Sequence, residues 1–178
     1  MTRVNIDNVR SLPDFATTFR WNFIMAQAPL IGAAGFPLSA DLDLRCESAE
    51  LPKATNQKIE INIRGHKVFQ PGITNFTNTI SLTFAETVDN RISIFLKAWR
   101  ELIWSFKSGS SFSKSDVEAT IILQRLNSQD EPIFNYTLYG CFLEDEEAGG
   151  TLDGASSDIL RPVAVLSYDY AQDTPLAI

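Results

Sequence analysis

The chain has 178 residues, of which 44% are hydrophobic and 21% are charged, and this composition excludes wholesale disorder. A net charge of −7 leaves no general basic surface, which argues against tight, groove-reading binding of nucleic acid. One domain typically spans about 100–200 residues, so we expect a single domain over residues 1–178, with residues 1–14 as an N-terminal extension.

The first segments predict strands separated by a loop. Residues alternate between apolar and polar over Thr17–Met25 and again over Leu42–Glu47, which is the period of a half-buried strand. Between them, Ala26–Ser39 contains two prolines and two glycines and predicts a loop. The aromatic alternation of the first strand favours core packing over a base-stacking platform. Its apolar positions are Phe19, Trp21, Phe23 and Met25.

The next segment predicts an arm. The second strand runs into Pro52, and the alternation resumes over Gln57–Arg64, with isoleucine at every second position from 59 to 63. Gly65, Pro71 and Gly72 favour an irregular polar loop over His66–Asn75 rather than regular structure. We expect residues 51–76 to form an extended hairpin arm. An arm of this size is larger than the core of one such domain can bury, so it is suited to contact with a neighbouring subunit.

A strand over Thr79–Thr87 leads into the one predicted helix. Apolar residues then follow the i, i+3, i+4, i+7 spacing of one helical face, with Asp89 as the expected N-cap and Gly109 just past the end. We expect this face to pack on the β body. Its members are Ile92, Phe95, Leu96, Trp99, Leu102, Ile103 and Phe106. Trp104 lies off this stripe and is expected to form a second contact surface.

The remaining chain predicts further strands. We expect strands over Val117–Leu126, Ile133–Leu143 and Leu160–Tyr170, a serine-rich loop over Ser108–Ser115 and a charged loop over Glu144–Glu147. The fold class is therefore mainly β. We expect an antiparallel β-sandwich or barrel with one amphipathic α-helix packed on it and an extended hairpin arm.

Residues with catalytic chemistry are sparse. His66 is the single histidine, and a solvated residue is the favoured interpretation of it. Cys46 and Cys141 are expected to be reduced and mostly buried, with a disulfide as the alternative. No zinc-ligand spacing, calcium loop, phosphate loop or nucleophile elbow can be written, although two acids brought together in space remain an open alternative. We expect no catalytic, cofactor-binding or metal-binding residue.

The order of these elements resembles the tail tube proteins of contractile-tailed bacteriophages, which are related to type VI secretion and pyocin tubes. The likeness covers roughly residues 15–171, and it depends on the order of elements because no single motif is diagnostic. The segments that carry it are Phe19–Met25, Ala49–Pro52, Ile59–Ile63, Ile80–Phe84, Phe95–Trp99 and Val163–Tyr170.

The resemblance implies a non-enzymatic structural subunit, without cofactor, that assembles into stacked hexameric rings. Implied partners are further copies, the tail sheath, the baseplate hub and the tail terminator, with phage DNA passing through the lumen without specific binding. The protein would be made in the host cytoplasm and reside in the virion tail. The subunit-interface candidates are Leu51, Pro52, Lys67, Val68, Phe69, Ile73 and Phe76.

Two alternatives remain. One is a tube initiator, a tube terminator or a baseplate homologue of the same fold, and the other is a small β-barrel that binds an apolar ligand. No segment approaches the roughly 20 apolar residues of a membrane span, and Met1–Asp14 lacks the apolar segment of a signal peptide. For the tube function, the acidic balance predicts a lumen surface that is net negative or neutral.

Overall fold

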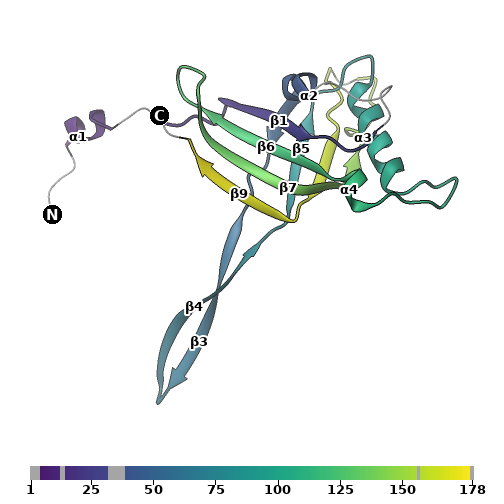
Figure 1. Ribbon diagram of the computed structural model, residues 1–178. Coiled ribbons are helices and arrows are strands. Elements are labelled where there is room, and N and C mark those ends of the chain that lie inside the picture. Colours follow the sequence, from purple (N-terminus) through teal and green to yellow (C-terminus); the bar gives the residue numbers. More distant parts are fainter. Residues whose placement is uncertain (1–4, 13–14, 32–38, 156, 177–178) are drawn as a thin grey trace.

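The computed structural model describes residues 5–12, 15–31, 39–155 and 157–176. Its elements are α1 (Ile6–Arg10), β1 (Trp21–Gln27), α2 (Ser39–Arg45), β2 (Cys46–Ala49), β3 (Ala54–Ile63), β4 (His66–Phe76), β5 (Thr79–Phe84), α3 (Arg91–Ile103), α4 (Lys114–Val117), β6 (Ala119–Leu126), β7 (Pro132–Glu147), β8 (Val163–Ser167) and β9 (Tyr170–Pro175). The predicted mainly antiparallel β architecture with a packed helix and a projecting hairpin is confirmed (Figure 1).

Two β layers share strand β7, which is 16 residues long. The first half of β7 pairs with β6 on one side and β9 on the other, and β6 pairs with β1. The second half of β7 pairs with β8, which continues through β5 to β2. The layers are therefore β1–β6–β7–β9 and β7–β8–β5–β2 (Figure 1). Buried side chains from both layers form a common core.

The change of layer is made at Gly140. This residue has φ +66°, and a Cβ atom there would lie 2.2 Å from Oδ2 of Asp169, so both the backbone conformation and the available space require glycine. The Asp169 carboxylate also accepts a hydrogen bond from Nζ of Lys114 at 2.6 Å. Pairing with β9 ends at Tyr139, and pairing with β8 begins at Phe142. The two neighbouring strands therefore bend together at one corner.

This corner corrects two predictions. The expected single strand Leu160–Tyr170 is divided into β8 and β9, because the chain turns opposite Gly140. The expected charged loop Glu144–Glu147 is the end of β7 instead, with Asp145 paired with Val165. These acidic side chains are mostly exposed, and exposed charges do not prevent the backbone from completing the ladder of hydrogen bonds.

Helix α3 packs on the β layers through the predicted stripe, but it is shorter than expected. Ile92, Phe95, Leu96 and Trp99 are buried, and Nε1 of Trp99 donates a hydrogen bond to the carbonyl of Val117 at 2.8 Å. The helix ends at Ile103, so Phe106 lies beyond it and is 82% exposed. The periodicity of the stripe extends past the end of the helix. Ile103, the last helical residue, still packs against the core, whereas Phe106 does not reach it.

The start of α3 differs from the predicted cap. Asn90, and not Asp89, occupies the N-cap position, in the left-handed region with φ 51° and with no side-chain cap of its own. The carboxylate of Glu86 accepts hydrogen bonds from the backbone N–H of Ser93 at 2.8 Å and of Ile92 at 3.3 Å. An acid from the preceding loop therefore satisfies two of the free N–H groups of the first turn.

The predicted second strand is mostly helix. Residues Ser39–Arg45 form α2, in which Leu42 is buried and Leu44 is 86% exposed. Leucines at every second position suggested a strand, but only one of them reaches the core. The helix also covers an edge of the sheet, because Ser39 Oγ accepts the N–H of Met25 at 3.1 Å and Asp43 accepts that of Phe23. The strand itself is confined to β2.

The predicted irregular loop His66–Asn75 is strand β4, which pairs with β3 over nearly its whole length. Pro71 and Gly72 lie where the register shifts between Asn56 and Lys58, and a β-bulge is one of the places where a strand tolerates proline. A Cβ atom on Gly72 would lie 3.0 Å from the carbonyl oxygen of Gln57. The proline and glycine therefore shape the strand rather than interrupt it.

The N-terminal extension contains the short helix α1. Residues 1–4 and 13–14 of that extension lie outside the described residues, and so do residues 32–38 of the expected loop Ala26–Ser39. The ends of that expected loop belong to β1 and α2. None of the helices within the described ranges is long and apolar enough to cross a membrane.

The two tryptophans of the α3 region give a matched stability test. Trp99 is 1% exposed and Trp104 is 49% exposed. We expect Trp99→Ala to lower the free energy of unfolding by about 3–5 kcal/mol, because it leaves a large cavity. Trp104→Ala should change it by no more than about 1 kcal/mol. Urea unfolding of both variants measures the difference, and equal effects would contradict this packing of α3.

Candidate assembly surface

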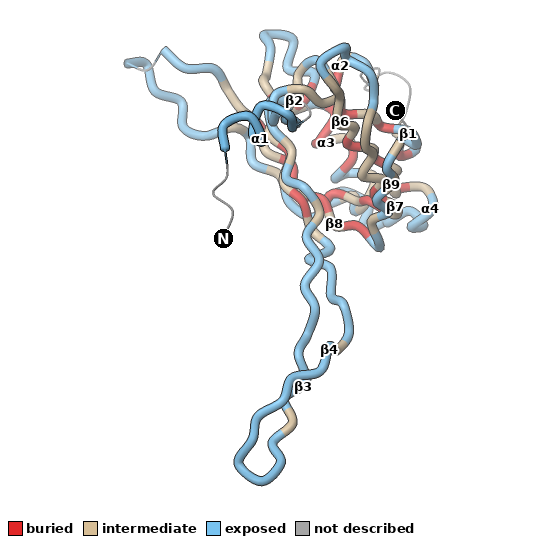
Figure 2. The backbone as a smooth tube through the Cα atoms, turned by 90° about the vertical axis from the view of Figure 1, so that its left-hand side faces the viewer, coloured by how far each residue is buried: buried red, intermediate tan, exposed pale blue. Residues whose placement is uncertain are grey.

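Strands β3 and β4 form an arm that stands apart from the two layers. Within the described residues they pair with each other and with no other strand. The hairpin closes through Arg64 and Gly65, both at positive φ. Figure 2 shows the arm projecting from the body and exposed along almost its whole length. An isolated two-stranded hairpin is only marginally stable in water, so the arm has little support until something covers it.

One side of the arm is apolar. Ile59, Ile61 and Ile63 alternate along β3 and therefore share a face, and Val68 of β4 lies directly opposite Ile61. Ile59, Ile63 and Val68 are each more than half exposed. Contiguous exposed apolar residues of this kind mark interaction sites rather than ordinary surface. This surface, defined by these four residues, is called the apolar face of the arm below.

The other side of the arm is charged. The ammonium of Lys58 lies 4.8 Å from the ring centroid of Phe69, and Nζ of Lys67 lies 2.7 Å from a carboxylate oxygen of Glu60. With Arg64 at the tip and Lys53 at the foot, residues 53–76 carry more cations than acids, although the whole chain has a net charge of −7. A basic arm on an acidic body has charge complementarity with the body of another copy.

All seven predicted interface candidates lie on the arm or at its foot. Leu51 and Pro52 precede β3, and the others lie in β4. Ile73 is the most exposed of them at 72%, whereas Val68 and Phe69 point to opposite sides of the hairpin. The sequence interpretation missed the isoleucines of β3, although their strict alternation was the available signal. The seven candidates are Leu51, Pro52, Lys67, Val68, Phe69, Ile73 and Phe76.

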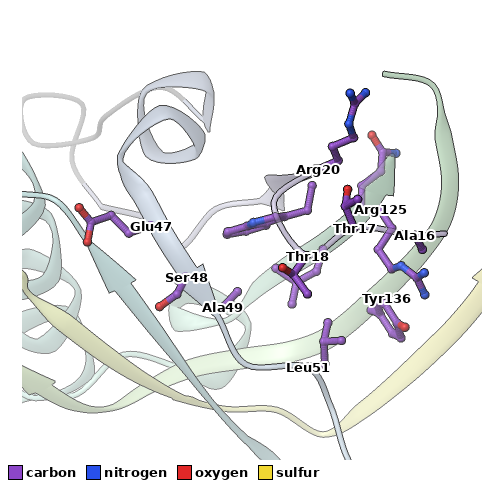
Figure 3. A pocket seen from close by; sticks show the side chains of 13 residues that line it. Ala16, Thr17, Thr18, Arg20, Glu47, Ser48, Ala49, Leu51, Arg125 and Tyr136 are labelled. Carbon is purple, nitrogen blue, oxygen red and sulfur yellow. The ribbon is translucent and has the colours of Figure 1, made fainter. Parts of the chain in front are cut away.

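A cavity of about 330 Å³ lies between the foot of the arm and the start of β1. Trp21, Leu123 and Tyr136 contribute its apolar lining, and Arg20 and Arg125 are among its polar residues. Figure 3 shows the side chain of Leu51 pointing from the foot of the arm toward Thr18 and Tyr136. The cavity therefore adjoins the same candidate residues that begin the arm.

The sheet edges differ in how well they are covered. The β1 edge has two of its N–H groups satisfied by α2, as described above. Strand β9 pairs only with β7 among the described strands. An uncovered strand edge presents unpaired N–H and C=O groups and can accept a strand from another chain. The β9 edge is therefore a second candidate contact.

Groups with reactive chemistry are isolated from one another. His66 lies at the tip of the arm, opposite Ile63. Cys46 and Cys141 are free thiols, and burial raises the pKa of each to about 12, so both stay protonated at neutral pH. No group of three or more His, Cys, Asp or Glu side chains in the described ranges could hold a metal ion.

The chain is similar to known proteins in sequence pattern and in fold. A family model described as phage tail tube protein matches residues 13–142. No curated protein sequence matches the chain significantly.

Solved structures share the fold, including the three that follow. A chain of the tube-terminating cap of the anti-feeding prophage has a TM-score of 0.65 at 14% identity, covering 93% of this chain and 95% of that one. A chain of the sheath/tube terminator of an extracellular contractile injection system has a TM-score of 0.64 at 15% identity, covering 92% and 99%. A chain of the sixfold-symmetrised anti-feeding prophage baseplate has a TM-score of 0.63 at 14% identity, covering 94% and 100%.

The apolar face of the arm gives a test on the unassembled protein. Replacing Ile59, Ile63 and Val68 by Thr should change the free energy of unfolding by less than about 1 kcal/mol, because these exposed side chains pack outside the core. The same change at buried Ile80 should cost at least about 2 kcal/mol. Binding of a hydrophobic dye should fall only in the arm variant.

Val88→Thr is the matched control for dye binding, since Val88 is also exposed, at 99%, but lies outside the arm. A triple variant that unfolds as easily as Ile80→Thr would show that the arm contributes to the core. Unchanged dye binding would show that the apolar face is covered in solution.

Proposed function

Because this chain belongs to the phage tail tube protein family, we propose that it is a structural subunit whose copies close into rings and stack to form the inner tube of a contractile tail. The family and the similar solved structures are structural tube proteins and not enzymes. The observation that carries the proposal is the arm, because it extends a basic, partly apolar hairpin beyond the reach of its own core.

Stacking follows from the shape of the arm. Its apolar face gains stability only when it is buried, and burial contributes roughly 25 cal/mol per Å² of apolar surface. A neighbouring ring supplies the surface that the protomer's own body does not. The contact is heterologous, because an arm meets a body rather than another arm, and a heterologous contact that does not close produces a filament. Repetition from ring to ring then builds a tube.

Ring closure requires a second heterologous contact. The free edge of β9 can receive a strand or edge from the next copy, which removes its unpaired backbone groups. Closure with six copies is supported by the sixfold symmetry of the baseplate structure that contains a similar chain. If the arm and the β9 edge contact other copies, the α3 side of the protomer stays free. Its exposed Trp104 can then contact other proteins of the tail.

The proposed context is a virion tail. The tube would meet the sheath along its length, the baseplate hub at one end and a terminator at the other, and would act as the conduit for DNA ejection. The subunits would be made in the cytoplasm of the host. A family of tail tube proteins and similar chains from a sheath/tube terminator, a cap and a baseplate support this assignment.

A terminator or initiator of the same fold is the second candidate, favoured by the similarity to chains of the cap and the sheath/tube terminator. The two functions differ in outcome, because a tube subunit adds rings without limit and a terminator stops at one. A ligand-binding function has weaker support. The space between the layers is filled by large side chains, including Phe23 and Phe84 in edge-to-face contact at 6.1 Å.

A shortened arm tests the proposal. Lys58 and Pro71 are paired, so residues 59–70 can be replaced by Asn-Gly, which closes a two-residue hairpin turn. We expect a folded protein that forms rings but no tubes in negative-stain images, since the stacking element is gone. The unaltered protein should give tubes at the same concentration.

A second variant separates length from chemistry. Replacing Ile59, Ile61 and Ile63 by Thr keeps a β-forming arm of full length but removes most of its apolar face. Loss of tubes in this variant as well would assign stacking to that face. Normal tubes from the shortened protein would contradict stacking by the arm, and persistent monomers of the unaltered protein would contradict the tube function.

A further inference from the structure

The outward side of the layer β1–β6–β7–β9 carries an unusual row of side chains. Asn22 pairs with Gln124, Gln124 with Asn135, and Asn135 with Thr174, so one line of amides and a hydroxyl crosses all four strands. Direct cross-strand partners lie on the same face of a sheet. The amide of Gln124 donates a hydrogen bond to Oδ1 of Asn135 at 3.1 Å, which fixes the centre of the row.

The neighbouring rows are also uncharged. Ile24, Ile122, Thr137 and Gln172 form the next line across the same four strands. Beyond it, Tyr139 and Tyr170 are paired and stacked, with ring centroids 4.7 Å apart and an angle of 18° between the planes. These residues are partly or fully exposed. The side of the layer defined by these three rows is called the neutral face below.

Charge is excluded from the neutral face and not merely scarce in this part of the chain. Within β1, β6, β9 and the part of β7 that belongs to this layer (residues 132–141), the charged residues are Arg125 and Asp173. They pair with Trp21 and Tyr136, whose positions belong to the opposite side of the layer. Lys, Glu, Arg and Asp are the residue types most often found on exposed surface. Their absence from every outward position described in these strands therefore needs a functional reason.

Ion pairs lie at the two ends of the neutral face. Nη1 of Arg20 lies 3.2 Å from Oδ1 of Asp130 near the β6–β7 turn. At the opposite end, Lys114 pairs with Asp169 at the corner of the layers. Each pair compensates its own charge. The chain's acidity lies elsewhere, for example in the exposed acids at the end of β7.

The neutral face is the surface of the protomer best suited to a channel wall. Figure 1 shows it as a broad, uncovered sheet surface, with α3 beyond one end of it and the arm descending from the other layer. The exposed side of α3 instead carries Lys97, Glu101 and Trp104, which suit contact with another protein. Uncharged amides and hydroxyls provide neither the cations that hold phosphates nor the anions that repel them.

We propose that the neutral face lines the lumen of the tube, so that a polymer passes it with neither electrostatic attraction nor repulsion. This inference rests on the proposed tube function. The sequence predicts a lumen surface that is either net negative or neutral, and the neutral face favours the second of these. The partner that fits the neutral face is a hydrated polymer that moves along the lumen without adhering to its wall. Because the wall is uncharged, its interaction with the cargo is independent of ionic strength.

Cysteine labelling of assembled tubes tests where the face lies. Thr137→Cys lies on the neutral face, and Glu101→Cys on α3 is the outer control. A small maleimide should label both, whereas a maleimide on a polymer too large for the bore should label only the control. The unaltered protein gives the background from Cys46 and Cys141. Gln172→Cys provides a second position on an edge strand if the first variant fails to assemble.

Charge substitution tests the chemistry of the wall. Tubes carrying Thr137→Lys and Gln172→Lys should retain short single-stranded DNA at about 50 mM salt and release most of it by about 200 mM, as phosphate contacts do. Unaltered tubes should retain none. Salt-sensitive retention by unaltered tubes would overturn the neutral wall, and so would no retention by the lysine variant.

The outcomes separate the two proposals. Tubes that form normally but label equally at Thr137→Cys and Glu101→Cys with the large reagent would overturn the placement of the neutral face and leave the tube function standing. A protein that forms no tubes under any condition would overturn both.

Discussion

The shared strand β7 is the constraint on which the two layers depend. It belongs to both, so the layers can face each other only if β7 and its neighbour turn at the same point. Gly140 permits that turn through its positive φ, and Asp169 occupies the space that a side chain would need. Lys114 donates a hydrogen bond to Asp169 and lies in α4, just before β6. This contact links the corner to β6, a strand of the first layer.

Local sequence patterns predicted those elements that keep one side buried and the other side exposed along their length. The stripe of α3 as far as Trp99 and the alternation from Trp21 to Met25 were identified correctly, because burial on one side imposes a single period. Both patterns were extended too far, since Phe19 and Phe106 lie outside β1 and α3 and are 73% and 82% exposed. The other errors fall where contacts distant in sequence decide. Ser39 and Asp43 form part of a helix that covers the edge of β1, and the acids after Leu143 continue a strand because β8 pairs with them.

The candidate surfaces were predictable only in part. The sequence placed the interface on residues 51–76 because a long, poorly buried segment has few other uses, but it could not show which side chains share a face of the hairpin. That required the register, which brings Val68 opposite Ile61. The neutral face was invisible for the same reason, since its rows join residues as distant in sequence as Asn22 and Thr174 only through the pairing of four strands.

The separation of the arm from the core has a consequence for how such proteins diverge. No arm residue belongs to the buried core, so substitutions in β3 and β4 are released from the packing requirements that restrict the body. The arm can therefore change its sequence, or be exchanged for that of a relative, with little effect on folding. If the arm joins successive rings as proposed, their recognition can drift independently of the scaffold, so that two tubes with the same protomer fold would exclude each other's subunits.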